Sequence, residues 1–454
     1  MRKESIYADN SNQLGERMLK RIKLRNFRAF KTLDIELSKI NLLFGPNNSG
    51  KSAIISSMNV IAQTLESADP VVPLLLVGSR VDLGTYRDAV YNNHPELPIT
   101  FGFEFTSSDP LESSRNVYVE LTYAYRKRQR EIVLDKAILN VSGRKNNFEL
   151  ASTRTSSGNS HTGIITVRKP GKRSMRYKAK FNFFHLTPFM PMVHGPQSPS
   201  HRPLDEAYFT IRRGMFSFSR ELSRIEYIGP FREYPARTFM FSGEHPRSAG
   251  KQGERAVNIL VSNYMRGGKR GKRYVRQVSR WLRSGGIARR LAVDIISDRH
   301  FEVKVVHSRT GESENLADVG FGCGQILPVL ASGYNLPRGS IFIVEQPEIH
   351  LHPKAQAELG SFFYELCRSG VQSIVETHSE HLLLRLQSYV ANGMLKPDDL
   401  KIYYVHANER GKKEAIEMRV GADGFIDTVW PGGFFPERLE EARKIAKGRT
   451  GETS

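Results

Sequence analysis

Apolar residues recur along the chain at two different periods, and the changes of period predict where its elements lie. Over residues 18–37 apolar and polar positions alternate, which predicts a strand, a turn and a second strand. The mainly apolar run 39–44 predicts a buried strand, and residues 52–65 predict a helix. Alternation returns over residues 99–143 and predicts antiparallel strands that cover one side of the preceding unit.

The middle of the chain has a weaker pattern. Residues 151–172 are rich in Ser, Thr, Gly and Lys, which predicts a long loop or a flexible hairpin. Residues 181–224 contain several Pro and aromatic residues and receive no assignment. A basic helical segment is predicted over about 253–291. No internal repeat and no sustained heptad pattern is present, so a long coiled coil is not expected.

The last third of the chain returns to alternating strands and helices. Residues 341–345 are wholly apolar except for a final acid, as expected for a central parallel strand. The other predicted elements here are a helix at 353–368, a strand at 371–376, a helix from about 378 and a hairpin at 401–405 and 415–418. This pattern predicts an α/β fold.

Residues 45–52 match the phosphate-binding loop G-x-x-x-x-G-K-S/T, and they lie between a predicted strand and a predicted helix. The glycines let successive backbone N–H groups point at phosphate oxygens, and the helix N-terminus favours an anion. Lys51 can reach the β- and γ-phosphates, and the Ser52 hydroxyl can contact Mg²⁺. A chance glycine-rich turn is the alternative, and the flanking elements make it the weaker one. The loop predicts a nucleoside triphosphate site.

The net charge of the chain indicates a second kind of partner, a polyanion. The formal net charge is +20, and residues 266–290 carry ten Lys or Arg and no acid. Tyr264, Tyr274 and Trp281 lie among these cations, where they could stack on bases. Nucleic acid is the polyanion that such a field favours, whereas a solvated basic face or an acidic protein partner is the alternative.

The remaining composition indicates a compartment. The two cysteines, Cys323 and Cys367, do not make a disulfide framework, so a reducing cytoplasm is expected. The most apolar short run, residues 71–77, is far shorter than a membrane span and contains Pro73. We therefore expect a cytoplasmic protein without a membrane partner.

Three further positions are candidates because of their order behind the phosphate loop. Glu345 ends a strand, where a phosphate-loop ATPase holds Mg²⁺, and His378 follows the next predicted strand, from which it could reach the γ-phosphate. A glycine-rich turn at 318–325 precedes a helix. A lone Glu at a strand end is more often solvated, and a lone His before a helix is more often a cap. Their joint order favours the functional interpretation.

Five stretches together resemble the head of an ABC-type ATPase. They are Arg28, the loop at 45–52, the turn at 320–325, the segment at 345–353 (Glu-Gln-Pro-Glu-Ile-His-Leu-His-Pro) and Thr-His-Ser at 377–379. Within that superfamily the chain resembles the SMC-like AAA heads of the RecF/Rad50/SMC and OLD-like group, including the PtuA ATPase subunits of Septu-type anti-phage defence. The resemblance covers residues 18–65 and 315–404 well and the middle only in patches.

The resemblance implies a fold and a division of the chain. The fold would be an α/β ABC-ATPase head, a phosphate-loop NTPase with a mixed central sheet and a β-rich lobe, plus an inserted basic and partly helical region. Residues 18–150 would form the N-terminal part of the head with the β-lobe. Residues 151–314 would be the insertion, loop-rich and then helical, and residues 315–454 would carry the signature turn, the Walker B strand and the switch histidine.

The resemblance also assigns residues to ATP and Mg²⁺. The nucleotide-binding residues that it implies are Arg28, Gly45, Asn47, Asn48, Ser49, Gly50, Lys51, Ser52, Ala53, Gly322, Gly324 and Gln325. The catalytic residues that it implies are Lys51, Glu345, Gln346 and His378. Ser52 and Glu345 would hold the metal ion. The turn at 320–325 would complete the site of a second subunit, so that ATP would be held between the heads of a homodimer or a higher homo-oligomer.

Gln346 departs from the pattern of the relatives. It occupies the position usually held by the glutamate that activates water, and an amide can orient water but cannot accept its proton. A naturally slow ATPase, a different base such as Glu348 or His350, and a deliberate Glu→Gln trap are all compatible with this residue. The turn also lacks the serine that many relatives have, which leaves backbone N–H groups to contact the γ-phosphate. We favour a natural glutamine.

The function that the resemblance implies is a nucleotide-driven switch in bacterial anti-phage defence. Hydrolysis of ATP to ADP and phosphate would gate a separate effector, such as an HNH nuclease or a toxin. A RecF-like DNA-repair clamp is one alternative. The other alternative is a non-hydrolysing scaffold that stays bound to ATP, and Gln346 is the residue that supports it.

Overall fold

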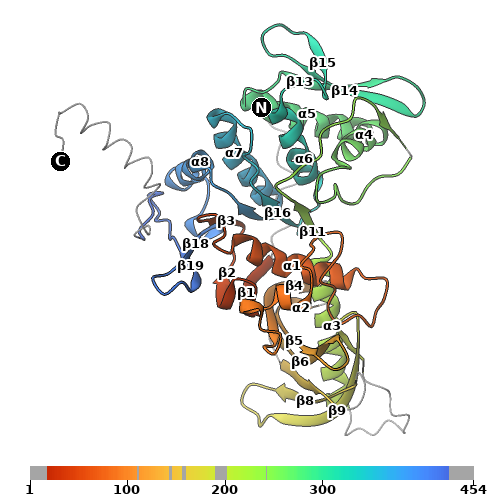
Figure 1. Cartoon of the computed structure of the whole chain (residues 1–454), viewed down its shortest axis with the longest axis vertical. Coiled ribbons are helices and arrows are strands. Elements are labelled where there is room, and N and C mark those ends of the chain that lie inside the picture. The colour runs from red at the N-terminus through yellow and green to blue at the C-terminus, as the bar shows by residue number, and fades with distance from the viewer. Residues whose placement is uncertain are drawn as a thin grey trace, which may run out of the picture.

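Three sheets organise the computed structural model, which describes residues 18–109, 112–142, 146–155, 160–189, 202–241 and 243–428. Figure 1 shows a β-rich part below and a part with most of the helices above, with β3 and α1 where the two meet. The central sheet has six strands in the order β11-β16-β17-β3-β18-β19. Their bounds are β11 Ile225–Ile228, β16 Ile341–Glu345, β17 Gln372–Glu376, β3 Ile40–Phe44, β18 Leu400–Ala407 and β19 Lys413–Glu417.

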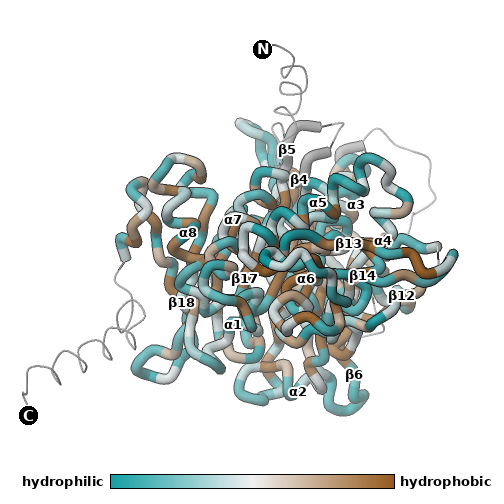
Figure 2. The backbone as a smooth tube through the Cα atoms, turned by 90° about the horizontal axis from the view of Figure 1, so that it is seen from above, coloured by the Kyte–Doolittle hydropathy of each residue, from teal (hydrophilic) through white to brown (hydrophobic). Residues whose placement is uncertain are grey.

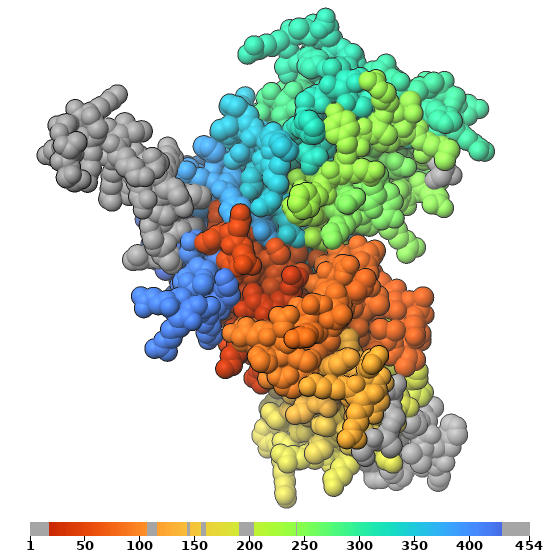
Figure 3. Space-filling view, in the orientation of Figure 1, coloured from red at the N-terminus to blue at the C-terminus, as the bar shows by residue number. Residues whose placement is uncertain are grey.

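The central sheet joins distant parts of the chain. The strand β3 lies between β17 and β18 and is parallel to both, and β16 is parallel to β17. Only β19 is antiparallel, and it forms with β18 the hairpin predicted near the C-terminus. Figure 3 shows the N-terminal residues, in red, in contact with the C-terminal ones, in blue. The strands β3, β16 and β17 are buried along their whole length, as parallel strands covered on both faces are.

Alternate residues of the central strands enter two different hydrophobic cores. Leu43 and Ile343 face the core that contains α1, whereas Leu42 and Phe342 face the core built with α4 to α8. Figure 2 shows hydrophobic segments gathered at the centre, where β17 and α6 lie. The helices are α1 Lys51–Leu65, α2 Tyr86–Ala89, α3 Arg202–Leu222, α4 Ala256–Arg266, α5 Gly268–Ser284, α6 Phe321–Asn335, α7 Pro353–Ser369 and α8 Glu380–Ala391, with short 3₁₀ turns η1 Tyr91–Asn93 and η3 Pro397–Asp399.

The β-rich part is one antiparallel sheet in the order β10-β9-β8-β7-β6-β5-β4-β1-β2, on which α3 packs. Its strands are β1 Met18–Phe27, β2 Phe30–Glu36, β4 Ile99–Asp109, β5 Glu112–Arg126, β6 Glu131–Ser142, β7 Asn147–Arg154, β8 Ser160–Arg168, β9 Met175–Phe184 and β10 Thr187–Phe189. The antiparallel strands predicted over residues 18–37 and 99–143 are confirmed.

Of the two alternatives predicted for residues 151–172, the long loop is wrong and the hairpin is confirmed, because most of that segment lies in the antiparallel strands β7 and β8 and the start of the turn into β9. The buried positions on the inward face of these strands include Ser152 and His161 as well as Leu150 and Ile165. Because polar residues occupy part of the inward face, the alternation of apolar and polar positions that is typical of a strand is not visible in the sequence. The sheet therefore continues past residue 150, which falls inside β7. The division of the chain into head and insertion stays a prediction, and residues 429–454 of its last part lie outside the described residues.

A small four-stranded sheet lies beyond α5. Its strands are β12 Phe239–Met240, β13 Arg290–Ile295, β14 His300–Val306 and β15 Ser313–Asn315. The predicted basic helical segment is confirmed as two helices, α4 and α5, which meet at Gly267 and Gly268. Within the part of the chain that is described, no helix has the length and apolar character needed to span a membrane.

Candidate nucleotide site

The phosphate loop turns tightly between β3 and α1, as its sequence predicts. Gly45 and Gly50 have φ of 140° and 115°, which side chains rarely allow. A Cβ atom at Gly45 would lie 2.0 Å from the carbonyl oxygen of Val405, so β18 closes that side of the loop. The helix α1 begins at Lys51, and no side chain of the described residues caps its N-terminus. The loop is therefore shaped to receive an anion.

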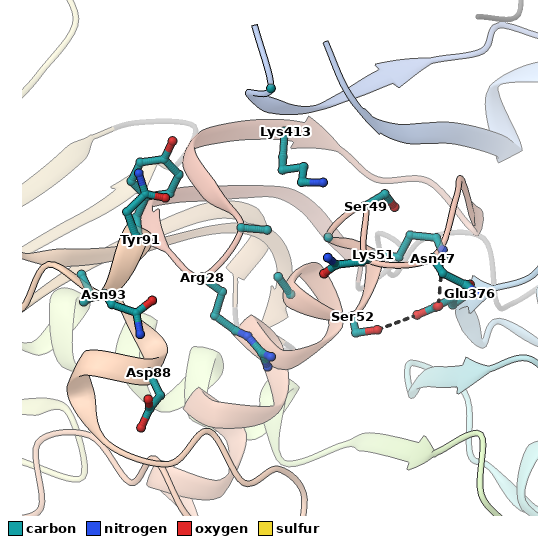
Figure 4. Close-up of a pocket in the computed structure, with 17 residues that line it drawn as sticks. Arg28, Asn47, Ser49, Lys51, Ser52, Asp88, Tyr91, Asn93, Glu376 and Lys413 are labelled. Carbon is teal, nitrogen blue, oxygen red and sulfur yellow. Dashed lines mark hydrogen bonds and ion pairs between the residues drawn. The ribbon is translucent and has the colours of Figure 1, made fainter. Parts of the chain in front are cut away.

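The loop opens on a cavity of about 820 Å³ (Figure 4). It is lined by Arg28, Ala29, Asn47, Asn48, Ser49, Gly50, Lys51, Ser52, Ala53, Asp88, Val90, Tyr91, Asn92, Asn93, Glu376, Gly411 and Lys413. Arg28 comes from the turn between β1 and β2 and has φ of 47°, and its N–H donates to the carbonyl of Ala89. The structure thus brings together Arg28 and every predicted residue of the segment 47–53.

Lys51 is bound to its own loop. Its ammonium donates to the carbonyl oxygens of Gly45 at 2.8 Å and Pro46 at 2.9 Å, and only 4% of the residue is exposed. Burial lowers the pKa of Lys51, and the carboxylates of Glu376 and Glu345 oppose that shift. The carbonyls fix the amine at the crest of the loop, where a phosphate oxygen can replace them.

Glu376 is the carboxylate that faces the loop, and the sequence analysis did not select it. It ends β17, the strand beside β3, and its Oε2 accepts a hydrogen bond from the Ser52 hydroxyl at 3.2 Å. Its Oε1 lies 3.8 Å from the Lys51 ammonium (Figure 4). Burial, and next the charge of Glu345, raise the pKa of Glu376 to about 7. The signal in the sequence that could have found Glu376 was an acid at the end of the predicted strand 371–376.

Glu345 is placed differently from the prediction. It pairs in register with Glu376 across β16 and β17, but it does not line the cavity. Its Oε1 accepts a hydrogen bond from the hydroxyl of Tyr227, on β11, at 2.5 Å. Both carboxylates are buried. The two acids form one buried pair, of which Glu376 is the member nearer to Ser52.

Gln346 lies in a constrained turn after β16. Its φ is 45°, and its N–H donates to the carbonyl of Glu376 at 2.7 Å. The buried guanidinium of Arg232 donates to the carbonyls of Glu345 at 2.6 Å and Gln346 at 3.2 Å. Burial lowers the pKa of Arg232 to about 10. Arg232 and Glu376 therefore fix the backbone on both sides of the position predicted to orient water.

His378 joins β17 to α8 and lies at the surface of the protein. The backbone N–H of His378 donates to the Glu348 carboxylate at 2.6 Å. Partial burial, followed by the charge of Lys51, lowers the pKa of His378, so its imidazole is neutral at pH 7. His378 does not line the cavity described above, and its role as a switch stays a prediction.

The predicted signature turn lies apart from the phosphate loop of its own chain. The helix α6 already begins at Phe321, so Gly322, Gly324 and Gln325 belong to its first turn rather than to a loop before it. A Cβ atom at Gly322 would lie 2.8 Å from the carbonyl oxygen of His350. Gln325 donates to the carbonyl of Arg232 at 3.3 Å. These residues do not line the cavity, and their place in a second subunit's site stays a prediction.

The donors of the cavity suit a triphosphate with Mg²⁺. Arg28, Lys51 and Lys413 bring positive charge, and Lys413 forms no ion pair with any part of the chain that is described. Figure 4 shows Lys413 reaching from β19 toward the loop. Mg²⁺ is usually held by one or two carboxylates together with substrate phosphates and water. No cluster of three metal-binding side chains is found among the described residues, so the phosphates would have to supply ligands. Ser52 and Glu376 would supply protein oxygens.

Replacing Glu376 with glutamine is expected to weaken the divalent metal ion in the nucleotide complex by about 10- to 100-fold, the usual effect of losing a metal partner. The amide keeps the shape of the side chain and removes its charge. Binding of Mn²⁺ in the presence of excess ATP, followed by electron paramagnetic resonance, measures this directly. Glu345→Gln is the matched control, with a smaller expected loss. A loss confined to Glu345→Gln would show that Glu345, as first predicted, meets the metal.

Comparison with known proteins identifies the family. The family model described as "AAA ATPase domain" matches residues 18–178 and 277–383, more than half of the chain. No curated protein sequence matches it. Among solved structures it is similar to an SMC head bound to the C-winged helix domain of ScpA, at 10% identity and a TM-score of 0.39, covering 88% of this chain and 97% of that one.

Two further solved structures are similar at the same level. The SMC head domain from Thermotoga maritima has 10% identity and a TM-score of 0.34, with 88% of this chain and 99% of that chain covered. The Smc head domain with an extended coiled coil, derived from Pyrococcus furiosus and bound to the C-terminal domain of ScpA, has 11% identity and a TM-score of 0.38, with 96% and 100% covered. By its match to the family model, the chain belongs to the AAA ATPase domain family.

Proposed function

We propose that this ATPase-family chain binds Mg-ATP at the phosphate loop, hydrolyses it to ADP and phosphate, and uses the nucleotide as a conformational switch. The observation that carries the proposal is the joint placement of Lys51, Ser52 and Glu376 around one cavity. The hydroxyl and the carboxylate are in contact, and the ammonium is held beside them. Bound Mg²⁺ would draw charge from the phosphates.

The protein's own residues would do the rest by position and charge. The loop N–H groups and Lys51 would hold the β- and γ-phosphates, and Ser52 would turn its hydroxyl from Glu376 toward the metal. Arg28 would approach from the opposite wall of the cavity, as Figure 4 suggests. Gln346 would orient the attacking water without taking its proton. Slow turnover is therefore part of the proposal.

A dimer would complete the site. The residues around the predicted signature turn form an exposed aromatic surface: Phe321 is 62% exposed and Phe231 is 84% exposed. Phe321 contacts the rings of Tyr234 and His350. Large exposed aromatic side chains are typical of interfaces. This surface supports a head-to-head homodimer in which the first turn of α6 reaches the nucleotide of the other subunit.

The biological setting is proposed from the resemblance to Septu-type ATPases. The switch would act in bacterial anti-phage defence in the cytoplasm and would gate a separate effector, such as an HNH nuclease or a toxin. A RecF-like clamp is favoured instead if the ATP-bound dimer acts on DNA alone. The scaffold alternative keeps Gln346 as its support, and it predicts an ATP-bound oligomer with no phosphate release.

The purified chain tests the proposal. ATP with Mg²⁺ is expected to stabilise the fold, by about 2.7 kcal/mol when ATP is at 100 times its Kd, and less so when EDTA removes the metal. Phosphate release should depend on Mg²⁺, and sedimentation should show a dimer with ATP and a monomer with ADP. No stabilisation at millimolar ATP would overturn nucleotide binding. A stable ATP-bound oligomer without phosphate release would replace the switch with the scaffold.

A further inference from the structure

A second large groove lies between α5 and β13, two elements that Figure 1 shows well away from α1. Its volume is about 820 Å³. The N–H of Leu291, on β13, donates to the hydroxyl of Ser279, on α5, at 3.0 Å and fixes the two walls together. The groove is lined by Tyr264, Lys269, Lys272, Val275, Arg276, Ser279, Arg280, Arg283, Arg290, Leu291, Ala292, Val293 and Asp294.

The groove is strongly cationic. Six of its lining residues carry a positive charge and are exposed: Lys269, Lys272, Arg276, Arg280, Arg283 and Arg290. Among the residues that the structure describes, none of these six is in an ion pair. The one acid in the lining, Asp294, already pairs with Lys304 at 2.9 Å. The positive charge is therefore uncompensated within the fold and available to an external polyanion.

The aromatic residues of α5 face the other way, so the expectation that they stack on bases is wrong. Tyr274 is 8% exposed, and its hydroxyl donates to the carbonyl of Ala331 at 2.7 Å. Trp281 is 3% exposed, and its Nε1 donates to the carbonyl of Glu358 at 3.0 Å. Both rings anchor α5 on the helices beneath it. A single strand would find only the half-buried Tyr264 to stack on, which favours a duplex whose bases stay paired.

The spacing of the cations suits a phosphate backbone. The five on α5 recur every three or four residues from Lys269 to Arg283, which is about 21 Å along the helix. A duplex carries about one phosphate per 1.7 Å of its axis when both strands are counted, so a stretch of this length has enough phosphates for each of the six cations of the groove. Contacts of this kind neutralise charge and carry no sequence information.

We propose that the groove between α5 and β13 binds the phosphate backbone of double-stranded nucleic acid without reading its sequence. The proposal goes beyond the proposed function, because it concerns a surface that shares no residue with the nucleotide cavity. It predicts that duplex binding persists when the phosphate loop is disabled. It also predicts a steep dependence on salt, since each neutralised phosphate releases a counterion.

Fluorescence anisotropy with a labelled 20-base-pair duplex of arbitrary sequence tests the proposal on the full chain. Six contacts predict a slope of log K against log salt of about −5. The double variant Lys272→Ala/Arg276→Ala should reduce the slope by about 2 and the affinity by at least tenfold at low salt. The matched control is Arg270→Ala/Arg273→Ala, which removes the same charge from exposed positions of the same helix outside the groove. It should keep most of the slope.

Further binding measurements distinguish between the possible anionic ligands. Duplexes of DNA and of RNA identify which nucleic acid is preferred, and a single strand should bind more weakly than either. Circular dichroism confirms that both double variants remain folded. An equal loss in the two double variants would overturn the groove as the site, because it would indicate only the overall charge. Equal binding of polyglutamate or of anionic vesicles would overturn nucleic acid as the ligand.

Discussion

Replacing Lys51 with alanine should reduce ATP hydrolysis at least 10²- to 10³-fold, the loss that follows removal of one group that stabilises developing charge. Among the residues that the structure describes, no other cation is held at the crest of the loop: the Lys51 ammonium is fixed by Gly45 and Pro46, whereas Arg28 and Lys413 approach from other walls. The variant also leaves the Glu376 carboxyl without the cation 3.8 Å away. Steady-state phosphate release measures the effect.

The control for Lys51→Ala is Lys412→Ala, an exposed lysine of the β18–β19 hairpin outside the cavity. It should leave both turnover and thermal stability unchanged. Comparison of the two variants separates the activity of this chain from that of a contaminating ATPase. If Lys51→Ala kept more than a tenth of the turnover, the phosphate loop would not be the catalytic site, and the proposed function would fail.

Replacing Gln346 with glutamate should raise turnover by about 10²- to 10⁴-fold, because a carboxylate can accept the proton of the attacking water and an amide cannot. The two side chains have nearly the same shape, so the backbone contacts with Arg232 and Glu376 should persist. The buried guanidinium of Arg232 would also offset part of the added charge. Single-turnover phosphate release under saturating Mg-ATP isolates the chemical step from product release.

The companion variant Gln346→Asn keeps an amide but shortens it, and it should not exceed the unmodified chain. A Gln346→Glu variant that is no faster than the unmodified chain would show that the base is elsewhere. Glu348 is then the first candidate, since it accepts the N–H of His378, and Glu348→Gln should in that case abolish the remaining turnover. Rapid hydrolysis by Gln346→Glu alone would support the ATP-bound scaffold for the chain as given.

The sequence was informative where a function depends on consecutive residues. The phosphate loop, the helix after it and the parallel strands near the C-terminus are all confirmed, because each is specified by a local pattern. The contact between Ser52 and Glu376 was missed because it depends on strand order. Only the placement of β17 between β3 and β16 makes Glu376, rather than Glu345, the nearer acid. Strand order is a tertiary property, and no local period encodes it.

Two other differences have a similar cause. The segment 151–172 was taken for a loop or a flexible hairpin because its inward positions include Ser152 and His161, which are polar yet buried. The rings of Tyr274 and Trp281 were assigned to a ligand because the charges around them were visible and the helices beneath them were not. An amphipathic helix that is cationic on one face can be recognised from sequence, but the partner of its other face cannot.

The central sheet has a consequence for synthesis of the chain. The strand β3 pairs with β17, so Ile40 cannot pair with Ser373 until that residue has left the ribosome. The same holds for Leu19, whose backbone N–H and carbonyl are hydrogen-bonded to the side chain of Gln372. At about 5–20 residues per second the delay is on the order of tens of seconds. Until then the phosphate loop has no neighbouring strand on either side. A nascent chain that ends before residue 376 lacks both Glu376 and Lys413, so the complete lining of the nucleotide cavity is present only after translation has passed residue 413.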